Sequence, residues 1–379
     1  MLQPAYQLFT TRDLTLKNRL AVSPMCQYSA KHGVANDWHF VHLGRFAIGG
    51  FGLVMVEATA VTPEGRISYG DLGLWSDEQI PALRRIVDFM HSQGTAAGIQ
   101  LAHAGRKAST PPPFRPSVDG LSEKEKQEIA FEDWQPLAPS PIIHSETLAG
   151  FKQPREMTLD DIEHFKTSYL AAVGRAEKAG FDVVEMHGAH GYLFNQFLSP
   201  LANKRTDQYG GSRDNRMRLL LEAAEAVRAA WQKPLFVRLS ISDNHPDGWT
   251  VEDSVVLVGK LKAIGVDVVD CSSGGFDGAA FRPKALYQVP LSAEIRAKTG
   301  MPTMTVGLIT EPEDAERIVA EGEADLVALA RAALDDPNWP VHARQKLQAS
   351  DDSYSTWPPQ AGYAIRNKDR ALKLRSFAE

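Results

Sequence analysis

Eight short apolar runs alternate with helical patterns along almost the whole chain, and this alternation restricts the possible folds more than any other feature. The runs are rich in Val, Ile, Leu and Ala, which is typical of parallel strands covered on both faces. They occupy residues 19–25, 52–61, 96–104, 182–187, 235–242, 267–274, 303–309 and 325–331. Eight strands, each followed by a helix, predict a (β/α)₈ TIM barrel, with a doubly wound open sheet as the alternative.

The segments between the runs carry helix signals. Apolar residues in 77–94 recur at helical spacing. Capping-box patterns begin at Thr158 and at Thr250, and Gly180 stands where the first of these two helices is expected to end. These signals support the alternation of strand and helix that a barrel requires.

Bulk properties exclude several classes of partner. A net charge of −6 and a pI near 6.0 give no electrostatic reason to bind nucleic acid or an anionic membrane. The N-terminal residues do not form a signal peptide, and no apolar run is long enough to cross a bilayer. Cys26 and Cys271 are far apart and lack metal-type spacing. We therefore expect a reduced, cytoplasmic protein whose residues 1–379 form a single domain.

Two segments do not fit the barrel repeat. Residues 107–154 follow the third strand and are rich in Pro, Ser and charged residues. A connection of this length predicts a functional excursion at the C-terminal face of the barrel, such as a lid or a subunit contact, with a solvated surface loop as the alternative. Residues 353–379 form a basic, aromatic tail after the eighth helix, expected to cover the barrel or to reach a neighbouring subunit.

Barrel enzymes take their catalytic residues from the C-terminal ends of the strands. Few carboxylates stand there, which disfavours glycosidase and Mg²⁺-dependent chemistry. The polar residues at these ends are Ser23, Cys26, Glu57, Thr59, Gln100, His103, His187, His190, Tyr192, Arg238 and Arg331.

The stretch "EMHGAHGYL" concentrates His187, His190 and Tyr192 between glycines. The residues alone leave three interpretations open: a pair of metal ligands, buried structural packing, or a site that polarises a substrate oxygen. A Zn²⁺ site would need a third ligand. His103 and Glu185 are the candidates for that ligand, and neither has motif spacing.

Two arginines indicate anion binding. Loops after the seventh and eighth strands of a barrel often hold phosphate, and there Gly307 permits close backbone approach while Arg331 offers a planar fork of donors. Arg238 in the fifth strand is expected to stabilise an anion elsewhere in the cavity. Its alternative is a structural ion pair with Glu57 or Glu185.

The segment "NKRTDQYGGSRDNRMR" (203–218), preceded by "HGAHGYL", resembles the signature of the Old Yellow Enzyme family of FMN-dependent ene-reductases. The resemblance extends over nearly the whole chain, through "LKNRLAVSPMCQYS", "VEATAVTPEGRIS", "GIQLAHAGRKAS" and "PTMTVGLIT". Cys26, with Tyr28 two residues later, is similar to the thermophilic-like bacterial branch with an active-site cysteine.

The resemblance implies a role for each matching residue. Tyr192 would protonate the substrate, His187 and His190 would bind its carbonyl or nitro oxygen, and Cys26 would tune the flavin. Tyr28 would border the substrate pocket, and Arg366 in the tail is a weaker candidate for contacting substrate in a neighbouring subunit. The residues implied to bind FMN are Ser23, Pro24, Met25, Cys26, Ala58, Gln100, Arg238, Gly307, Ala330 and Arg331.

The resulting hypothesis is an NAD(P)H dehydrogenase that acts as an ene-reductase. NADPH or NADH would reduce tightly bound FMN, which would pass hydride to the β-carbon of an activated alkene such as an enone, maleimide or nitroalkene. We expect no bound metal, and a homodimer or homotetramer. The alternatives are a metal-dependent barrel hydrolase that uses His187 and His190, and a non-catalytic flavin-binding redox sensor. A dienoyl-CoA reductase type of enzyme is disfavoured because two isolated cysteines cannot hold an iron–sulfur cluster.

Overall fold

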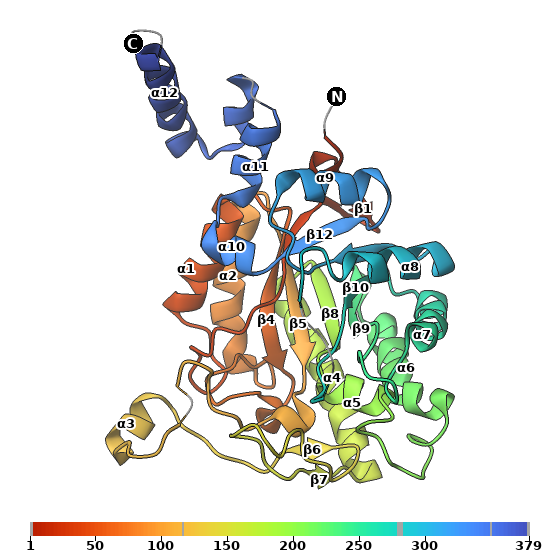
Figure 1. Cartoon of the computed structure of the whole chain (residues 1–379). Coiled ribbons are helices and arrows are strands. Elements are labelled where there is room, and N and C mark those ends of the chain that lie inside the picture. The colour runs from red at the N-terminus through yellow and green to blue at the C-terminus, as the bar shows by residue number, and fades with distance from the viewer. Residues whose placement is uncertain (1–2, 116, 279–282, 349–350, 377–379) are drawn as a thin grey trace.

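The eight apolar runs form a closed barrel of parallel strands in the computed structural model, which describes residues 3–115, 117–278, 283–348 and 351–376 (Figure 1). β12 pairs with β3 and closes the barrel, so the predicted TIM barrel is confirmed and the open sheet is wrong. In chain order the strands are β3 (Leu20–Val22), β4 (Leu53–Ala60), β5 (Ala96–Ala102), β8 (Val183–Gly188), β9 (Leu235–Ser240), β10 (Val268–Ser272), β11 (Thr303–Thr305) and β12 (Leu326–Leu329).

Helices follow each strand and form the outer layer of the barrel (Figure 1). The capping boxes at Thr158 and Thr250 start α4 and α7, and Gly180 and Gly265 end these helices in the left-handed conformation. The covering helices are α1 (Asp37–Ile48), α2 (Ile80–Ser92), α4 (Leu159–Ala179), α5 (Leu193–Leu198), α6 (Arg213–Ala230), α7 (Val251–Ile264), α8 (Val289–Thr299), α9 (Pro312–Ala320), α10 (Arg331–Asp335) and α11 (Trp339–Leu347).

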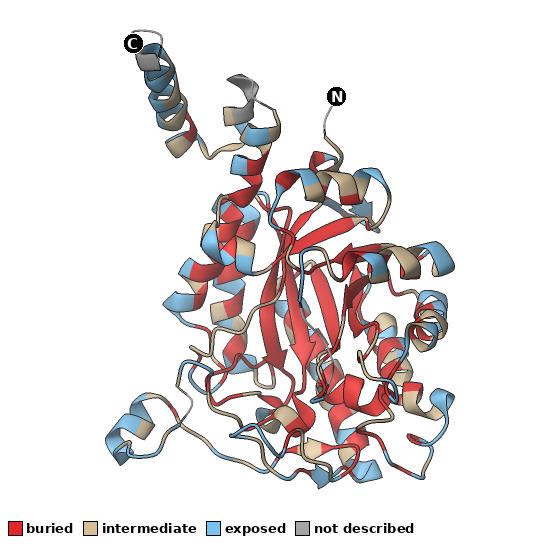
Figure 2. Cartoon of the chain, in the orientation of Figure 1, coloured by how far each residue is buried: buried red, intermediate tan, exposed pale blue. Residues whose placement is uncertain are grey.

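Every residue of the eight barrel strands is buried, as the red strands of Figure 2 show. One apolar cluster inside the barrel takes residues from all eight strands. Phe9 and Leu16 join this cluster from a hairpin of β1 (Phe9–Thr11) and β2 (Leu14–Leu16). The interior near the N-terminal ends of the strands is therefore filled and apolar, which leaves the C-terminal ends for chemistry.

The excursion lies at the C-terminal ends of the strands, as predicted (Figure 1). It contains the short elements η4 (Gly105–Lys107), α3 (Glu123–Glu128) and β6 (Leu137–Ala138), and β6 pairs in parallel with β7 (Arg155–Glu156). Its role as a lid or subunit contact stays a prediction.

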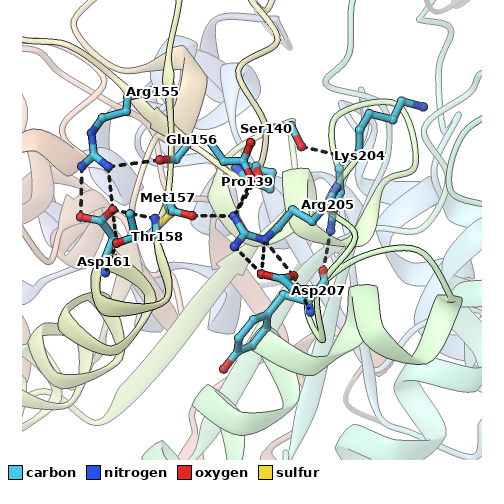
Figure 3. A network of polar contacts seen from close by, with 12 residues as sticks. Pro139, Ser140, Arg155, Glu156, Met157, Thr158, Asp161, Lys204, Arg205 and Asp207 are labelled. Carbon is cyan, nitrogen blue, oxygen red and sulfur yellow. Dashed lines mark hydrogen bonds and ion pairs between the residues drawn. The ribbon is translucent and has the colours of Figure 1, made fainter.

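Arg205, in the segment that resembles the family signature, anchors the end of this excursion (Figure 3). Its Nη1 donates to the carbonyl oxygens of Pro139 at 3.1 Å and Met157 at 2.6 Å. Its Nη2 and Nε donate to Asp207 at 2.6 and 3.1 Å. The arginine thereby joins the chain after α5 to both flanks of the β6–β7 pair.

The C-terminal tail continues from α11 through η5 (Asp351–Thr356) to α12 (Pro359–Ser376), and residues 377–379 of the predicted tail lie outside the described residues. α12 extends from the end of the molecule opposite to the excursion (Figure 1). Tyr354 Oη donates to Asp369 Oδ2 at 2.9 Å and ties η5 to α12. The tail therefore does not cover the C-terminal face of its own barrel.

Within the described ranges, none of the helices combines the length and apolar character that crossing a bilayer demands.

Candidate active site

A cavity of about 230 Å³ opens among the C-terminal ends of the barrel strands. It extends from the ends of β3, β5 and β9 to the loops after β11 and β12. Eight of the predicted site residues line it: Ser23, Pro24, Gln100, His190, Arg238, Gly307, Ala330 and Arg331.

His187 and Tyr192 adjoin the cavity beside His190. The His187 ring centroid lies 5.2 Å from that of His190 and 4.9 Å from that of Tyr192, each in an edge-to-face arrangement. His187 is the next-to-last residue of β8, and His190 and Tyr192 lie in the turn that follows, so one strand end and one turn bring the predicted trio together.

The turn that presents these side chains depends on its glycines. His190 has a positive φ of 59° and Gly191 one of 70°. A Cβ on Gly191 would lie 2.2 Å from the carbonyl oxygen of Gly275 in the loop after β10. Because no side chain fits there, the two loops meet backbone to backbone, and His190 and Tyr192 share one wall of the site.

Both imidazoles are neutral. Burial, and then the charges of Arg238 and Lys107, lower the pKa of His187 well below its usual value. Burial and Arg238 do the same to the pKa of His190. The Nδ1 atom of His187 accepts from the backbone N–H of Ala189 at 3.4 Å, which leaves Nε2 to carry the proton.

His190 is held at two points. Its backbone N–H donates to Ser240 Oγ at 2.9 Å, and its Nε2 lies 2.6 Å from Ser272 Oγ. A serine hydroxyl donates or accepts, so Ser272 is compatible with either tautomer of His190.

Tyr192 is a protonated phenol. Burial, and then the nearby Cys26 and Tyr28, raise its pKa well above the usual value. Lys107 Nζ lies 5.0 Å from the centre of its ring and donates to the carbonyl oxygen of His190 at 3.0 Å. Lys107 is the first residue of the excursion, and its sequence position alone did not predict this contact.

Cys26 belongs to the Tyr192 side of the site and does not line the cavity. Burial, and then Asp71 and Glu57, raise the pKa of its thiol, so the sulfur is protonated. Tyr28 has a positive φ of 51° and is hydrogen-bonded to Cys26. Its ring contacts Phe114 of the excursion at 6.2 Å between centroids.

Arg238 stands at the floor of the cavity. Its Nη1 donates to Ser23 Oγ at 2.9 Å. Its Nε lies 3.2 Å from Asp270 Oδ2 but is not aligned for a hydrogen bond. Gln100 Nε2, on the same floor, donates to Glu185 Oε1 at 2.8 Å. The ion-pair partner of Arg238 is thus Asp270, which the sequence analysis did not list among the strand-end residues.

The opposite end of the cavity suits an anion. Gly307 has a φ of 129°, and a Cβ there would lie 3.1 Å from the Tyr287 ring and 3.2 Å from Gln288 Oε1. Arg331 and the backbone from Ala328 to Ala332 line the same end. A ligand with a polar ring system at the Arg238 end and a phosphate at the Arg331 end fits these donors, as FMN requires.

Besides His187, Tyr192, Cys26 and Tyr28, three predicted site residues do not line the cavity. Met25 packs against the outer core, and Ala58 is buried beside Cys26. Arg366 lies on α12, away from the cavity of its own chain (Figure 1). Its predicted contact with a neighbouring subunit stays a prediction.

Among the described residues, no group of three or more His, Cys, Asp or Glu side chains is placed to hold a metal ion. The rings of His187 and His190 contact each other; His187 also contacts Tyr192, and His190 also contacts Ser272.

A profile of the NADH:flavin oxidoreductase / NADH oxidase family matches residues 6–350. The chain is 48% identical over 341 residues to an NADPH dehydrogenase of Geobacillus thermodenitrificans (strain NG80-2), a match that covers 89% of this chain and 93% of the relative. It is 46% identical over 341 residues to an NADPH dehydrogenase of Geobacillus sp. (strain WCH70), with the same coverage.

Solved structures give the same fold. Morphinone reductase superposes with a TM-score of 0.74 at 26% identity, covering 91% of this chain and 90% of that chain. A 2-naphthoyl-CoA reductase in complex with 2-naphthoyl-CoA gives a TM-score of 0.81 at 23% identity, which bears on the fold alone. That match covers 92% of this chain and 53% of that reductase, so the chain spans about half its length.

Profile, relatives and barrel agree with the family and cofactors predicted from the sequence. The chain belongs to the NADH:flavin oxidoreductase / NADH oxidase family, that is, the Old Yellow Enzyme family of oxidoreductases that use FMN with a nicotinamide hydride donor.

Proposed function

We propose that this protein is an ene-reductase that reduces activated alkenes such as enones, maleimides and nitroalkenes. The observation that carries the proposal is the convergence of two neutral imidazoles and one protonated phenol beside a cavity suited to FMN. FMN held in this cavity would supply the hydride chemistry, from NADPH or NADH to the β-carbon of the alkene.

The histidines polarise the substrate. An isolated C=C bond accepts hydride poorly, so the adjacent carbonyl or nitro oxygen must take up negative charge as the hydride arrives. His187 donates through Nε2, because its Nδ1 already accepts from the backbone. The proposal requires the tautomer of His190 in which Ser272 donates to Nε2 at 2.6 Å and the imidazole proton stays on Nδ1 as the second donor. Two fixed donors in a buried site stabilise the developing anion.

Tyr192 supplies the proton to the α-carbon. Its raised pKa keeps the phenol protonated throughout the neutral range. Lys107 holds a positive charge over the ring, which stabilises the phenolate that forms when the proton leaves.

The chain offers donors along the whole length of the cofactor. Arg238, Gln100 and Ser23 would hold the ring edge at the cavity floor, and Arg331 with the backbone at Gly307 and Ala330 would hold the phosphate. Cys26 is a neutral thiol, so it would tune the flavin as a weak hydrogen-bond donor rather than as a negative charge.

The printed names of the relatives support a nicotinamide-dependent reductase. Two are NADPH dehydrogenases and one solved structure is morphinone reductase. We further propose that the protein forms a homodimer or homotetramer in which Arg366 reaches the site of a neighbour, since α12 extends away from its own cavity.

The test separates the two half-reactions by anaerobic stopped-flow absorbance of the flavin. Tyr192→Phe should slow reoxidation by an enone by about 10²- to 10⁴-fold, the usual contribution of a general acid, and leave reduction by NADPH largely unchanged. If Tyr192→Phe showed wild-type rates in both half-reactions, Tyr192 would not be the proton donor.

A second variant tests whether the two histidines bind the substrate oxygen. His187→Ala with His190→Ala should weaken binding of a phenol, followed through the charge-transfer absorbance of bound flavin. Tyr192→Phe is the matched control, because it keeps both imidazoles. Unchanged phenol affinity in the double variant would show that the histidines do not hold the substrate oxygen.

A further inference from the structure

Two carboxyl groups lie together below the cavity floor, inside the barrel. Glu185 of β8 and Asp270 of β10 both have no exposed surface. The two carboxyl groups are within hydrogen-bonding reach of each other. Glu185 Oε2 and both oxygens of Asp270 find no N–H or O–H donor among the described residues. Carboxylates cannot donate, so a hydrogen bond between them needs a proton that both oxygens share.

The described residues offer this pair one positive charge, that of an arginine. Arg238 lies on β9 between the two strands, with Nε 3.2 Å from Asp270 Oδ2. Gln100 of β5 donates to Glu185 but carries no charge. Two ionised carboxylates against one guanidinium would leave a net negative charge in a dry interior, which is strongly unfavourable.

In the part of the chain that the structure describes, no other charged group neutralises the pair. His187, at the end of β8, faces Arg238 and is kept neutral by burial. Tyr169 on α4 faces Glu185 and is a protonated phenol, and Cys271 beside Asp270 is a protonated thiol. Among the described residues, Glu185, Asp270 and Arg238 thus set the charge of the layer of side chains below the cavity floor.

We infer that Glu185 and Asp270 hold one proton between them and act as a positioning pair for Arg238. The singly protonated pair carries one negative charge, which the guanidinium balances. Asp270 then fixes the Nε side of Arg238, while Nη1 bonds to Ser23 at the wall of the cavity.

The pair also sets the charge below the cofactor. This part rests on the proposed function, because it requires FMN above Arg238. With the proton in place the layer is neutral, and loss of the proton at high pH adds a full negative charge below the ring edge. Negative charge there opposes the extra electrons of the reduced cofactor and shifts its midpoint potential to more negative values.

Infrared difference spectroscopy of the purified protein tests the shared proton directly. At neutral pH the wild type should show a protonated-carboxyl C=O band that shifts in D₂O. Glu185→Gln and Asp270→Asn should each lose this band, because the carboxylate that remains pairs with Arg238 alone. Glu177→Gln, on the exposed face of α4, is the control that should leave the band intact.

Three outcomes would overturn the inference. A band that both variants keep belongs to another carboxyl group, which means that the pair does not hold the proton. Loss in one variant alone means that the proton belongs to that residue and is not shared. A wild-type band that persists to the alkaline limit of folding means that the layer does not titrate. None of these outcomes depends on FMN, so they are distinct from a failure of the proposed function.

Two further measurements keep the test open if one variant folds poorly. Burial, and then the partner carboxylate, raise the pKa of Glu185, so the folded protein binds more protons than the unfolded chain above the ordinary carboxyl range. The wild type should therefore lose thermal stability relative to Glu185→Gln as pH rises to that raised pKa. The midpoint potential of bound FMN should fall more steeply with pH in the wild type than in Glu185→Gln. Parallel curves in both measurements would contradict the proton-holding pair.

Discussion

Two buried arginines of this barrel bind carboxylates in opposite ways. Arg205, at the anchor of the excursion, uses all three of its nitrogens: Nε and Nη2 donate to Asp207, and Nη1 donates to backbone carbonyls (Figure 3). Arg238, at the cavity floor, makes one hydrogen bond, to Ser23, and one ion pair with Asp270.

The difference separates a structural arginine from one that is ready for a ligand. A buried donor without a partner costs about 1–3 kcal/mol, so a chain tolerates it where a ligand completes the bonding. Arg205 has no donor nitrogen to spare, and its task is to hold two segments together. Arg238 keeps donor capacity beside a cavity, which is what recognition of a cofactor edge requires.

The largest loss of stability is expected at Arg205, whose donor nitrogens are all hydrogen-bonded. Arg205→Met leaves Asp207 and the carbonyls of Pro139 and Met157 without their buried partner, and should lower the free energy of unfolding by about 3–5 kcal/mol. Chemical denaturation followed by circular dichroism measures this loss. A change below 1 kcal/mol would mean that the excursion is held by other contacts and that the contrast between the two arginines is false.

Substitution of Arg238, whose donors are only partly used, should affect FMN binding more than stability. Arg238→Gln keeps a donor for Ser23 but removes the charge, and should weaken FMN binding by about 1.5–3 kcal/mol, the value of a hydrogen bond to a charged group. Stability without FMN should fall less than in Arg205→Met, because Glu185 and Asp270 can take up a second proton. Fluorescence titration with FMN measures the affinity. An unchanged dissociation constant would place the cofactor elsewhere.

The sequence predicted the barrel because its signals are local. Apolar runs, capping boxes and terminal glycines each act within a few residues, and every predicted strand appears in the structure. The residues at strand ends were found for the same reason, since the C-terminal ends of parallel strands meet at one face.

Residues whose role depends on register between strands were not found. Asp270 lies opposite Arg238 in the β9–β10 register, and a single sequence does not state that pairing. Lys107 reaches Tyr192 only because the loops after β5 and β8 meet at the backbone of His190. Arg205 was recognised as part of a family signature, yet its structural task follows from carbonyls up to 66 residues away in the chain.

The hydrogen-bonding capacity of Lys107 is used more fully than that of Arg238 and less fully than that of Arg205. Its Nζ donates to the carbonyl oxygens of His190 and Gly275 and lies over the Tyr192 ring. Lys107→Met should slow the alkene half-reaction by about 0.5–2 kcal/mol, the value of a cation–π contact, and should spare flavin reduction. Anaerobic stopped-flow measurements resolve the two rates.

The pH dependence of Lys107 sharpens this prediction. Burial lowers its pKa to about 8, so the rate advantage over Lys107→Met should fade as pH rises past that value. The folding stability of the wild type, relative to Lys107→Met, should instead increase with pH. Between about 8 and the ordinary lysine value the unfolded chain binds more protons, so the wild type gains stability relative to Lys107→Met in that window. A rate ratio that is constant with pH would exclude an electrostatic role.

The smallest effect is expected at an arginine that shares the neighbourhood of Arg205 but not its burial. Arg155 makes a two-point contact with Asp161 at 2.7 and 3.0 Å, with its side chain 45% exposed (Figure 3). Because water screens this pair, Arg155→Gln should cost less than about 1 kcal/mol, and less still in high salt. The contact with Arg155 lowers the pKa of Asp161, so the stabilisation is present above the ordinary carboxyl pKa and is lost as pH falls through the lowered one. Unfolding curves of both proteins should therefore converge in acid. A loss as large as that of Arg205→Met would mean that the number of hydrogen bonds, rather than burial, determines how much these arginines contribute to stability.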